Sequence, residues 1–144
     1  MSISEVERID DQGMAAWDQH NVDDFVALFA SDFVFRDVSV PEVFTTPEGV
    51  RRYMEAWYKA FPDMRAKTTN RVVSENQVAG EVQFTATHSG PLNFGGTEIP
   101  ATGKSVVGGG SYFAKVEDGK IVSFTAYPDA AGLMAQLGLM GAQA

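Results

Sequence analysis

The spacing of apolar residues changes from a helical period to a strand period at Pro62. Over residues 4–19 and again over 46–61, apolar side chains recur every three or four positions, which predicts two amphipathic helices. The second helix has a clear start and stop, because Thr46 suits the N-cap and Pro62 cannot continue a helix. Its apolar stripe consists of Val50, Tyr53, Met54, Trp57 and Phe61.

A shorter helix and a strand are expected between these two helices. Asn21 is a suitable N-cap, and two aspartates follow in the first turn, where acids are favourable. Residues 33–38 then alternate with a period of two, which predicts a short strand. In this strand Phe33, Phe35 and Asp37 share one face, so Asp37 is predicted to point inward at the strand's end.

After Pro62 the pattern predicts four strands and no long helix. Residues 64–74 and 78–88 form two of them, and on the second one His88 ends a face that is otherwise apolar. A long loop rich in glycine and proline follows. Residues 105–116 and 120–127 are then expected to form a hairpin about the Asp-Gly turn at 118–119.

A two-residue turn fixes the register of that hairpin. The predicted pairs are Val116 with Ile121, Phe113 with Phe124, Tyr112 with Thr125, and Gly108 with Asp129. This register places Tyr112 on the same strand face as Tyr127 and Asp129. The three glycines at 108–110 lack the context of a phosphate-binding loop and predict a bulge or sharp bend.

The order of elements predicts an α+β fold. A curved, mostly antiparallel sheet is expected to wrap around three N-terminal helices, and a short helix follows Asp129 near the C-terminus. No linker or repeat divides the chain, so residues 1–144 are predicted to form a single domain. The apolar, methionine-rich C-terminal segment is expected to close the mouth of the fold or to pack on a partner subunit.

Composition narrows the classes of ligand and partner. The net charge is −8, and no basic cluster exceeds Arg51-Arg52, which argues against nucleic acid and anionic membranes. With two histidines and no cysteine, a transition-metal site is not expected, and disulfides are excluded. No cofactor motif is present. The acidic N-terminus does not read as a signal peptide, so a cytoplasmic protein that binds a small organic molecule is predicted.

Several strings of the chain resemble the SnoaL-like polyketide cyclase and ester cyclase family of the nuclear-transport-factor-2-like superfamily. They are "AWDQHNVDDFVALFASDFVFRD", "AFPDMR", "THSG" with "PATGK", and "KVEDGKIV" running into "YPDAAGLMAQLG". Together they span nearly the whole chain. The resemblance implies a cone in which a strongly curved sheet and three helices enclose one apolar pocket. It also implies a homodimer formed through the sheet.

The resemblance further implies acid–base chemistry without a cofactor. In the cyclases an aspartate on the final strand serves an intramolecular aldol ring closure of a polyketide-like substrate. Relatives often read His-Trp-Asp at positions that are Phe124, Thr125 and Ala126 here. Ala126 in place of an acid keeps a second class open, a non-catalytic binding module of the same fold. An isomerase or a hydrolase variant also stays open. An epoxide hydrolase of this fold would need an Asp–Arg–Asp arrangement in the pocket. This activity is disfavoured, because Arg36 and Asp37 are adjacent on a strand and point to opposite faces.

Two residues are the predicted proton carriers, and each has an ordinary structural explanation. Asp129 suits the N-cap of the last helix, and it also lies where the final strand leads toward the pocket mouth. His88 either anchors the turn after its strand or titrates inside the pocket. Asp37 is a further acid that either bonds a local turn or reaches the pocket.

Aromatic residues are the predicted wall of the pocket. The candidates for contact with a ligand are Trp17, Phe35, Tyr53, Trp57 and Tyr112, together with Asp37. The hydroxyl of Tyr112 or Tyr53 is a candidate donor to a developing enolate oxygen. An aromatic stripe at helical spacing is also typical of a core, so Tyr53 and Trp57 either pack only in the core or, in a cone, line the cavity as well.

Overall fold

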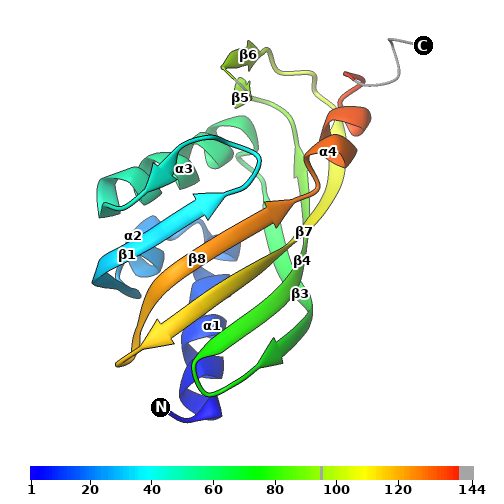
Figure 1. Ribbon diagram of the computed structural model, residues 1–144. Helices are drawn as coiled ribbons and strands as arrows, with labels where there is room; N and C mark the ends of the chain where they lie inside the picture. The colour runs from blue at the N-terminus through cyan, green and yellow to red at the C-terminus, as the bar shows by residue number, and fades with distance from the viewer. Residues whose placement is uncertain (95, 140–144) are drawn as a thin grey trace.

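A six-stranded sheet curls around three helices in the computed structural model, which describes residues 1–94 and 96–139 (Figure 1). The strand order is β2-β1-β8-β7-β4-β3, and neighbouring strands are antiparallel except β1 and β8, which are parallel. The strands are β1 (Phe29–Asp37), β2 (Val43–Phe44), β3 (Arg65–Val73), β4 (Gln77–Thr87), β7 (Ser105–Glu117) and β8 (Lys120–Pro128). The predicted α+β class and curved sheet are therefore confirmed.

Helices lie where the sequence predicts them, and the last three begin just after their predicted capping residues. They are α1 (Ile3–Gln19), α2 (Val22–Val26), α3 (Pro47–Ala60) and the short C-terminal α4 (Ala130–Gln136). The side chains of Asn21, Thr46 and Asp129 each accept a hydrogen bond from a backbone N–H in the first turn of the following helix. Within the described residues, no helix is long and apolar enough to cross a membrane.

The strand after α2 begins four residues earlier than predicted. α2 ends at Val26, and β1 starts at Phe29 rather than at residue 33. The apolar run from Phe25 to Ala30 fits a buried helix or a buried strand equally well by its periodicity. Tertiary packing decides between them, because the ring of Phe29 contacts Phe25 and Phe33 at centroid distances of 5.1 and 4.8 Å.

The predicted loop over 89–104 contains a small second sheet. β5 (Leu92–Phe94) pairs antiparallel with β6 (Thr97–Ile99) above the end of α3 (Figure 1). α4 lies nearby and buries Leu133, Met134 and Leu137 in a core cluster with Phe61. Residues 140–144 of the C-terminal segment that was predicted to close the mouth or contact a partner lie outside the described residues.

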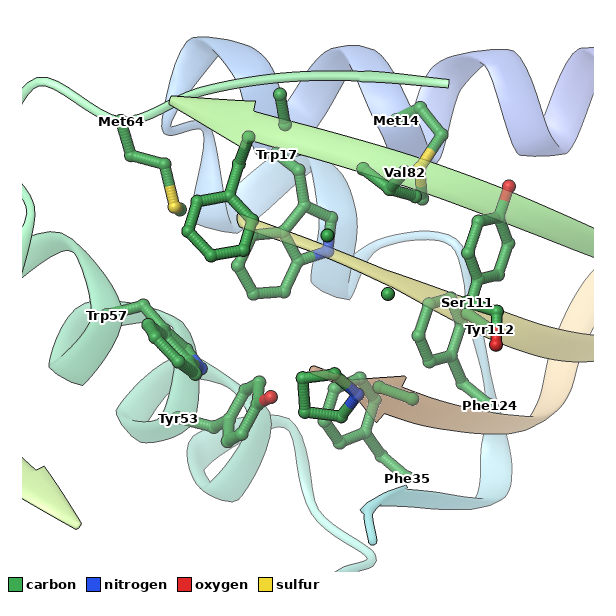
Figure 2. A pocket seen from close by; sticks show the side chains of 16 residues that line it. Met14, Trp17, Phe35, Tyr53, Trp57, Met64, Val82, Ser111, Tyr112 and Phe124 are labelled. Carbon is green, nitrogen blue, oxygen red and sulfur yellow. The ribbon is translucent and has the colours of Figure 1, made fainter. Parts of the chain in front are cut away.

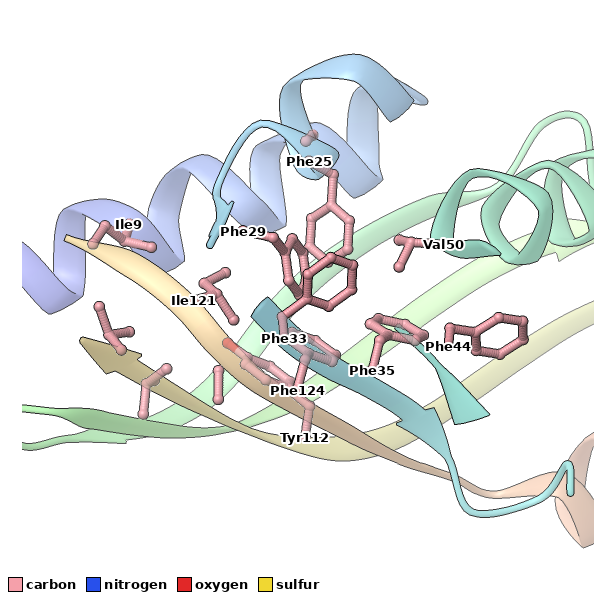
Figure 3. Close-up of a cluster of buried hydrophobic side chains, with 14 of the residues drawn as sticks. Ile9, Phe25, Phe29, Phe33, Phe35, Phe44, Val50, Tyr112, Ile121 and Phe124 are labelled. Atoms are coloured by element: carbon pink, nitrogen blue, oxygen red, sulfur yellow. The ribbon is translucent and has the colours of Figure 1, made fainter. Parts of the chain in front are cut away.

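Stacked aromatic rings form the main core between the helices and the sheet (Figure 3). Phe124 of β8 is central, because its ring stacks on Phe35 on one side and on Tyr112 on the other, each with a centroid distance of 5.2 Å. Phe25 from α2 meets the same ring edge-on at 5.7 Å. Aromatic pairs of this kind stabilise a core by about 0.5–1.5 kcal/mol each beyond their burial.

The predicted register of the β7–β8 hairpin is wrong beyond its first pair. Val116 pairs with Ile121 as predicted, but a shift between Lys115 and Val116 pairs Phe113 with Thr125 and Tyr112 with Ala126. One inserted residue at this bulge moves every later residue of β8 to the other face. Tyr112 therefore shares its face with Ala126, whereas Tyr127 is 45% exposed on the outer face.

Of the bulge or sharp bend predicted at the glycines 108–110, the bulge is absent from the β4–β7 ladder. The β4–β7 ladder continues without a shift through all three residues, with Gly108 opposite Phe84. The glycine is required for another reason, since a Cβ at position 108 would lie 2.1 Å from the Phe84 ring. Gly108 thus allows the phenyl ring to lie across β7.

Candidate active site

A cavity of about 130 Å³ lies between the helices and the concave face of the sheet (Figure 2). α1, α3 and the strands β1, β3, β4, β7 and β8 all contribute to its wall. It is lined by Met14, Trp17, Phe35, Tyr53, Trp57, Met64, Ala66, Val82, Phe84, Gly109, Gly110, Ser111, Tyr112, Phe124, Ala126 and Pro128. None of these side chains carries a charge, so the wall is apolar and aromatic.

Five of the six side chains that were predicted to contact a ligand line this cavity. They are Trp17 of α1, Phe35 of β1, Tyr53 and Trp57 of α3, and Tyr112 of β7. Tyr53 and Trp57 are four residues apart on one helix, so both project from the same face. Their role in binding a ligand stays a prediction.

Asp37, the sixth, is buried directly behind the wall. Its side chain is fully enclosed at the end of β1, and its Oδ2 accepts a hydrogen bond of 2.5 Å from the hydroxyl of Tyr53. Its Oδ1 accepts from the backbone N–H and the hydroxyl of Ser39, at 2.8 and 2.6 Å. In the described part of the chain no ion pair reaches this carboxylate. Asp37 therefore connects to the cavity only through Tyr53.

The Tyr53 hydroxyl holds its proton firmly. Burial raises the pKa of Tyr53 well above its usual value, and the neighbouring Asp37 carboxylate raises it further, while the Trp57 side chain acts in the opposite direction. The phenol consequently stays a donor to Asp37 at neutral pH. The hydrogen bond joins a cavity-lining hydroxyl to a buried carboxylate, and a proton can pass along this bond.

A second tyrosine–aspartate pair lies at the other end of the cavity. The Tyr112 hydroxyl donates to Oδ1 of the buried Asp10 at 2.5 Å, and Oδ2 of the same carboxylate accepts from Arg71 at 3.0 Å. Arg71 also pairs with Asp11 and Glu7. Burial, followed by the hydrogen bond to Asp10, raises the pKa of Tyr112.

The two tyrosine–aspartate pairs differ in whether the carboxylate has a cationic partner and in where the tyrosine hydroxyl points. Arg71 neutralises Asp10, whereas Asp37 has only hydroxyl and N–H partners. Figure 2 shows the Tyr112 hydroxyl at the far side of its ring, away from Tyr53 and Trp57. Tyr112 therefore presents its ring to the cavity and uses its hydroxyl to hold α1 against the sheet.

The two predicted proton carriers do not line the cavity. Asp129 is exposed, and its Oδ1 accepts from the Gly132 N–H at 2.9 Å as the cap of α4. The adjacent Pro128 is a wall residue, but with the corrected register Asp129 does not share the face of Tyr112. The catalytic role of Asp129 stays a prediction, and no contact between Asp129 and the cavity supports it.

His88 is fully buried in the second core cluster. Its ring packs on Phe61 at a centroid distance of 5.4 Å, and its Nδ1 accepts from the Thr102 backbone N–H at 3.2 Å. Burial lowers the pKa of His88, so the imidazole is neutral near pH 7. His88 is not joined to Asp37, and it anchors the segment that leads into β7. Its catalytic role also stays a prediction.

Position 126, where the resemblance implies an acid, does lie in the wall. Ala126 lines the cavity, and in the parallel β1–β8 pair its backbone partner is Asp37. The carboxylate nearest to position 126 is thus supplied by the neighbouring strand. Arg36, by contrast, is exposed on the opposite face from Asp37, as the alternation predicted.

Sequence reasoning missed Ser39 and Asp10. Ser39 follows Asp37 by two residues, and this spacing allows a local turn in which an aspartate accepts from the N–H two residues on. Asp10 falls between the apolar positions Ile9 and Gly13 of α1 and could be recognised only by its buried partner. Among the described residues, no group of three metal-ligating side chains could hold a metal ion.

The curved sheet, the three helices beneath it and the apolar cavity between them define a protein of the nuclear-transport-factor-2-like fold. The family model of SnoaL-like polyketide cyclases matches residues 7–137. The chain belongs to this SnoaL-like family, which confirms the resemblance. Among curated proteins, none matches the chain.

Solved structures support the same fold. AclR from Streptomyces galilaeus is 25% identical with a TM-score of 0.82, over 97% of this chain and 85% of that one. IdmH from Streptomyces antibioticus is 24% identical with a TM-score of 0.76, over 92% and 97%. A protein with a ketosteroid isomerase-like fold from Catenulispora acidiphila is 18% identical with a TM-score of 0.73, over 91% and 92%.

Proposed function

We propose that the chain is a cofactor-independent acid–base enzyme that moves a proton of a small carbonyl compound in the apolar cavity. The reaction class is an intramolecular aldol-type ring closure or a related proton transfer. The observation that carries this proposal is the pair formed by Tyr53, a wall residue, and Asp37, a buried carboxylate without a cationic partner in the described residues. A buried carboxylate that reaches an apolar cavity through one hydroxyl group is suited to general base catalysis.

The proposed steps conserve every proton. The Tyr53 oxygen accepts a proton from the carbon next to the carbonyl, while its own proton passes to Asp37. The resulting enolate carbon attacks a second carbonyl carbon of the same molecule, which forms the new carbon–carbon bond and an alkoxide. The alkoxide takes a proton from Tyr53, and Asp37 returns its proton to Tyr53. The pair ends as it began.

The size of the cavity supports a compact substrate. An apolar cavity of about 150 Å³ binds benzene, so the present volume of about 130 Å³ accommodates about one ring. A polycyclic, polyketide-like substrate would place one ring inside and the remainder at the mouth.

Exchange of acidic C–H protons tests this proposal without knowledge of the natural substrate. The probe is 2-indanone in D₂O, whose protons next to the carbonyl exchange for deuterium, followed by proton NMR. We expect the protein to accelerate the exchange and Asp37→Asn or Tyr53→Phe to lower that rate about 10²-fold or more. Asp118→Asn in an exposed turn and Tyr127→Phe on the outer face are matched controls. Unchanged exchange in Asp37→Asn contradicts the assignment.

The same assay tests the alternatives. If Asp129→Asn or His88→Gln abolishes exchange while Asp37→Asn retains it, the proton carrier is the residue predicted from the sequence. A second function, a non-catalytic binding module, is favoured by Ala126 in the cavity wall. In that case 2-indanone binds, but neither the parent protein nor any variant accelerates the exchange of its protons.

We also propose that residues 1–144 form one cytoplasmic domain that dimerises through the outer face of the sheet. Apolar side chains gather there, with Val72, Val107, Phe113 and Tyr127 each at least 45% exposed. Phe113 and Tyr127 contact each other at a centroid distance of 6.0 Å. Exposed apolar patches of this kind mark contact surfaces. Phe113→Glu should convert a dimer to a monomer in light scattering, and a monomeric parent protein contradicts the proposal.

A further inference from the structure

The hydroxyl groups in the cavity wall are not available to a ligand oxygen. Five wall residues carry a polar side chain: Trp17, Tyr53, Trp57, Ser111 and Tyr112. The hydroxyls of Tyr53 and Tyr112 already donate to Asp37 and Asp10. Ser111 pairs across the strands with the exposed Tyr127 and Glu81, so its side chain lies on the outer face and its backbone forms the wall.

The two indole N–H groups are the remaining side-chain donors. No hydrogen bond of full geometry joins either indole to the described residues. The Trp57 side chain lies close enough to the Tyr53 hydroxyl to lower its pKa, and Trp17 takes part through its backbone carbonyl, which accepts from Tyr58. The only side-chain nitrogen or oxygen that is sealed off without a partner in this part of the chain is Nε2 of His88. The indole nitrogens therefore still reach accessible space. A tryptophan N–H can donate but not accept.

Both indoles lie beside the proposed proton carrier. The ring of Tyr53 is 6.2 Å from that of Trp17 and 6.4 Å from that of Trp57, with interplanar angles of 81° and 74°. Figure 2 shows the nitrogen of Trp57 toward Tyr53 and the nitrogen of Trp17 on the cavity side of its ring. A donor near a buried site ordinarily has an acceptor. The Trp57 N–H has the Tyr53 oxygen as a weak neighbour, and the Trp17 N–H has no acceptor among the described residues.

The charges behind the wall restrict what that acceptor is. Asp37 is buried behind the wall without a cationic partner, and none of the described residues that line the cavity is cationic, whereas Asp10 is neutralised by Arg71. An anionic group would therefore lose its hydration without a counter-charge. A neutral carbonyl oxygen accepts two hydrogen bonds and has no such cost, so it suits two indole donors.

We propose that the indole N–H groups of Trp17 and Trp57 bind the carbonyl oxygen of an uncharged substrate and hold its adjacent carbon beside Tyr53. This inference rests on the proposed function and names its substrate class and its oxygen-binding residues. When the proton leaves carbon, negative charge develops on that oxygen, and fixed N–H donors in a dry cavity stabilise it. Neither indole gives up its proton, so the proton balance of the reaction is unchanged.

A matched pair of probes tests the proposal on the intact protein. The probes are 2-indanone and 2-methyleneindane, which differ only in whether the ring carries C=O or C=CH₂. The chain has two tryptophans, so a ¹⁵N–¹H spectrum contains two indole signals, and both come from the cavity. Trp17→Phe and Trp57→Phe assign them.

We expect the ketone to move both indole protons downfield and to bind about tenfold more tightly than the hydrocarbon, as a net hydrogen bond implies. The proposal is overturned if 2-indanone leaves both signals in place up to its solubility limit, or if the two probes move them equally. These measurements need no variant, so a tryptophan variant that fails to fold does not affect the outcome.

The failure of this proposal is distinct from that of the proposed function. If Asp37 does not carry the proton, Asp37→Asn retains both exchange and the indole shifts. If the indoles do not bind the oxygen, the ketone exchanges in the parent protein without a specific shift. With both proposals correct, each Trp→Phe variant lowers the preference for the ketone severalfold and the exchange rate about 10²-fold, whereas Asp37→Asn lowers exchange alone.

Discussion

Asp37 and Ala126 are direct cross-strand partners in the parallel pair of β1 and β8, and they share the concave face of the sheet. The first is a buried acid that accepts from Tyr53, and the second is a wall residue without a functional group. The proposed catalytic carboxylate therefore lies one strand away from position 126, where the resemblance implies an acid.

Ala126→Asp should place two carboxylates side by side in a dry site. Like charges at this separation cannot both ionise easily, so the pKa of one member of the pair rises. The acid limb of the 2-indanone exchange profile should move to higher pH, and the protein should lose about 2 kcal/mol of stability at pH 7. Ala126→Asn adds nearly the same volume without charge, so an identical profile in both variants contradicts this prediction.

Arg71→Leu should be strongly destabilising because it leaves the buried Asp10 carboxylate without its cation. Arg71 is partly exposed, so the expected cost is about 2–3 kcal/mol rather than the larger value for a fully buried pair. Urea unfolding measures it. Adding Asp10→Asn removes the charge that Arg71 neutralises, so the double variant should be more stable than Arg71→Leu alone. A double variant of equal or lower stability would show that Arg71 acts through packing.

Low pH should remove the contribution that the ion pair between Asp18 and Arg65 makes to the stability of the folded protein. The hydrogen bond from Arg65, followed by that from the Ala66 backbone, lowers the pKa of Asp18 from 3.8 to about 2. A lowered pKa in the folded state contributes stability above pH 4, and this contribution is lost as the pH falls toward 2. Because Arg65 is exposed, we expect about 1 kcal/mol at pH 7. The stability gap between the parent protein and Asp18→Asn should close near pH 2, and a constant gap contradicts this.

His88 should give a separate loss of stability in a less acidic window. Burial lowers its pKa below the usual 6.5, so the unfolded chain binds a proton before the folded one does. Stability is therefore complete above pH 6.5 and falls as the pH decreases toward the lowered pKa. His88→Gln does not titrate, so its stability should be flatter between pH 6.5 and 5. Equal slopes in the two proteins would show that other groups cause the loss.

Local signals in the sequence account for most of the correct fold predictions. The caps Asn21 and Thr46 and the turn at Asp118-Gly119 depend on bonds between residues at most three apart, so they can be recognised in the sequence alone. The hairpin register failed because the bulge at Lys115 and Val116 has no glycine or other local signature. One missed residue there was enough to place Tyr112 and Asp129 on the same face.

The site was predicted less completely because its bonds join distant residues. Tyr53 and Asp37 were each recognised as pocket candidates, but they lie 16 residues apart on a helix and a strand, and nothing local indicates their contact. Tyr112 and Asp10 are 102 residues apart. The Pro-Asp entry into a helix is compatible with Asp129 as a cap and as a catalyst, so the sequence alone does not distinguish the two roles.

Gly108→Ala should deform the cavity because the new methyl group meets the Phe84 ring, with 2.1 Å to its nearest carbon. Phe84 is a wall residue that also packs near Trp57, at a centroid distance of 6.4 Å, so its displacement changes the space available to a ligand. We expect a loss of about 1–3 kcal/mol in urea unfolding together with a severalfold weaker affinity for 2-indanone. Gly109→Ala is the matched control: the backbone of Gly109 lines the cavity, but a Cβ there would project to the outer face, where the nearest atom is the Val82 oxygen at 3.3 Å. Because a methyl group at position 109 is less crowded, Gly109→Ala should lower the stability by a smaller amount. Equal losses of stability in the two variants would show that the clash with the Phe84 ring is not the cause of the loss.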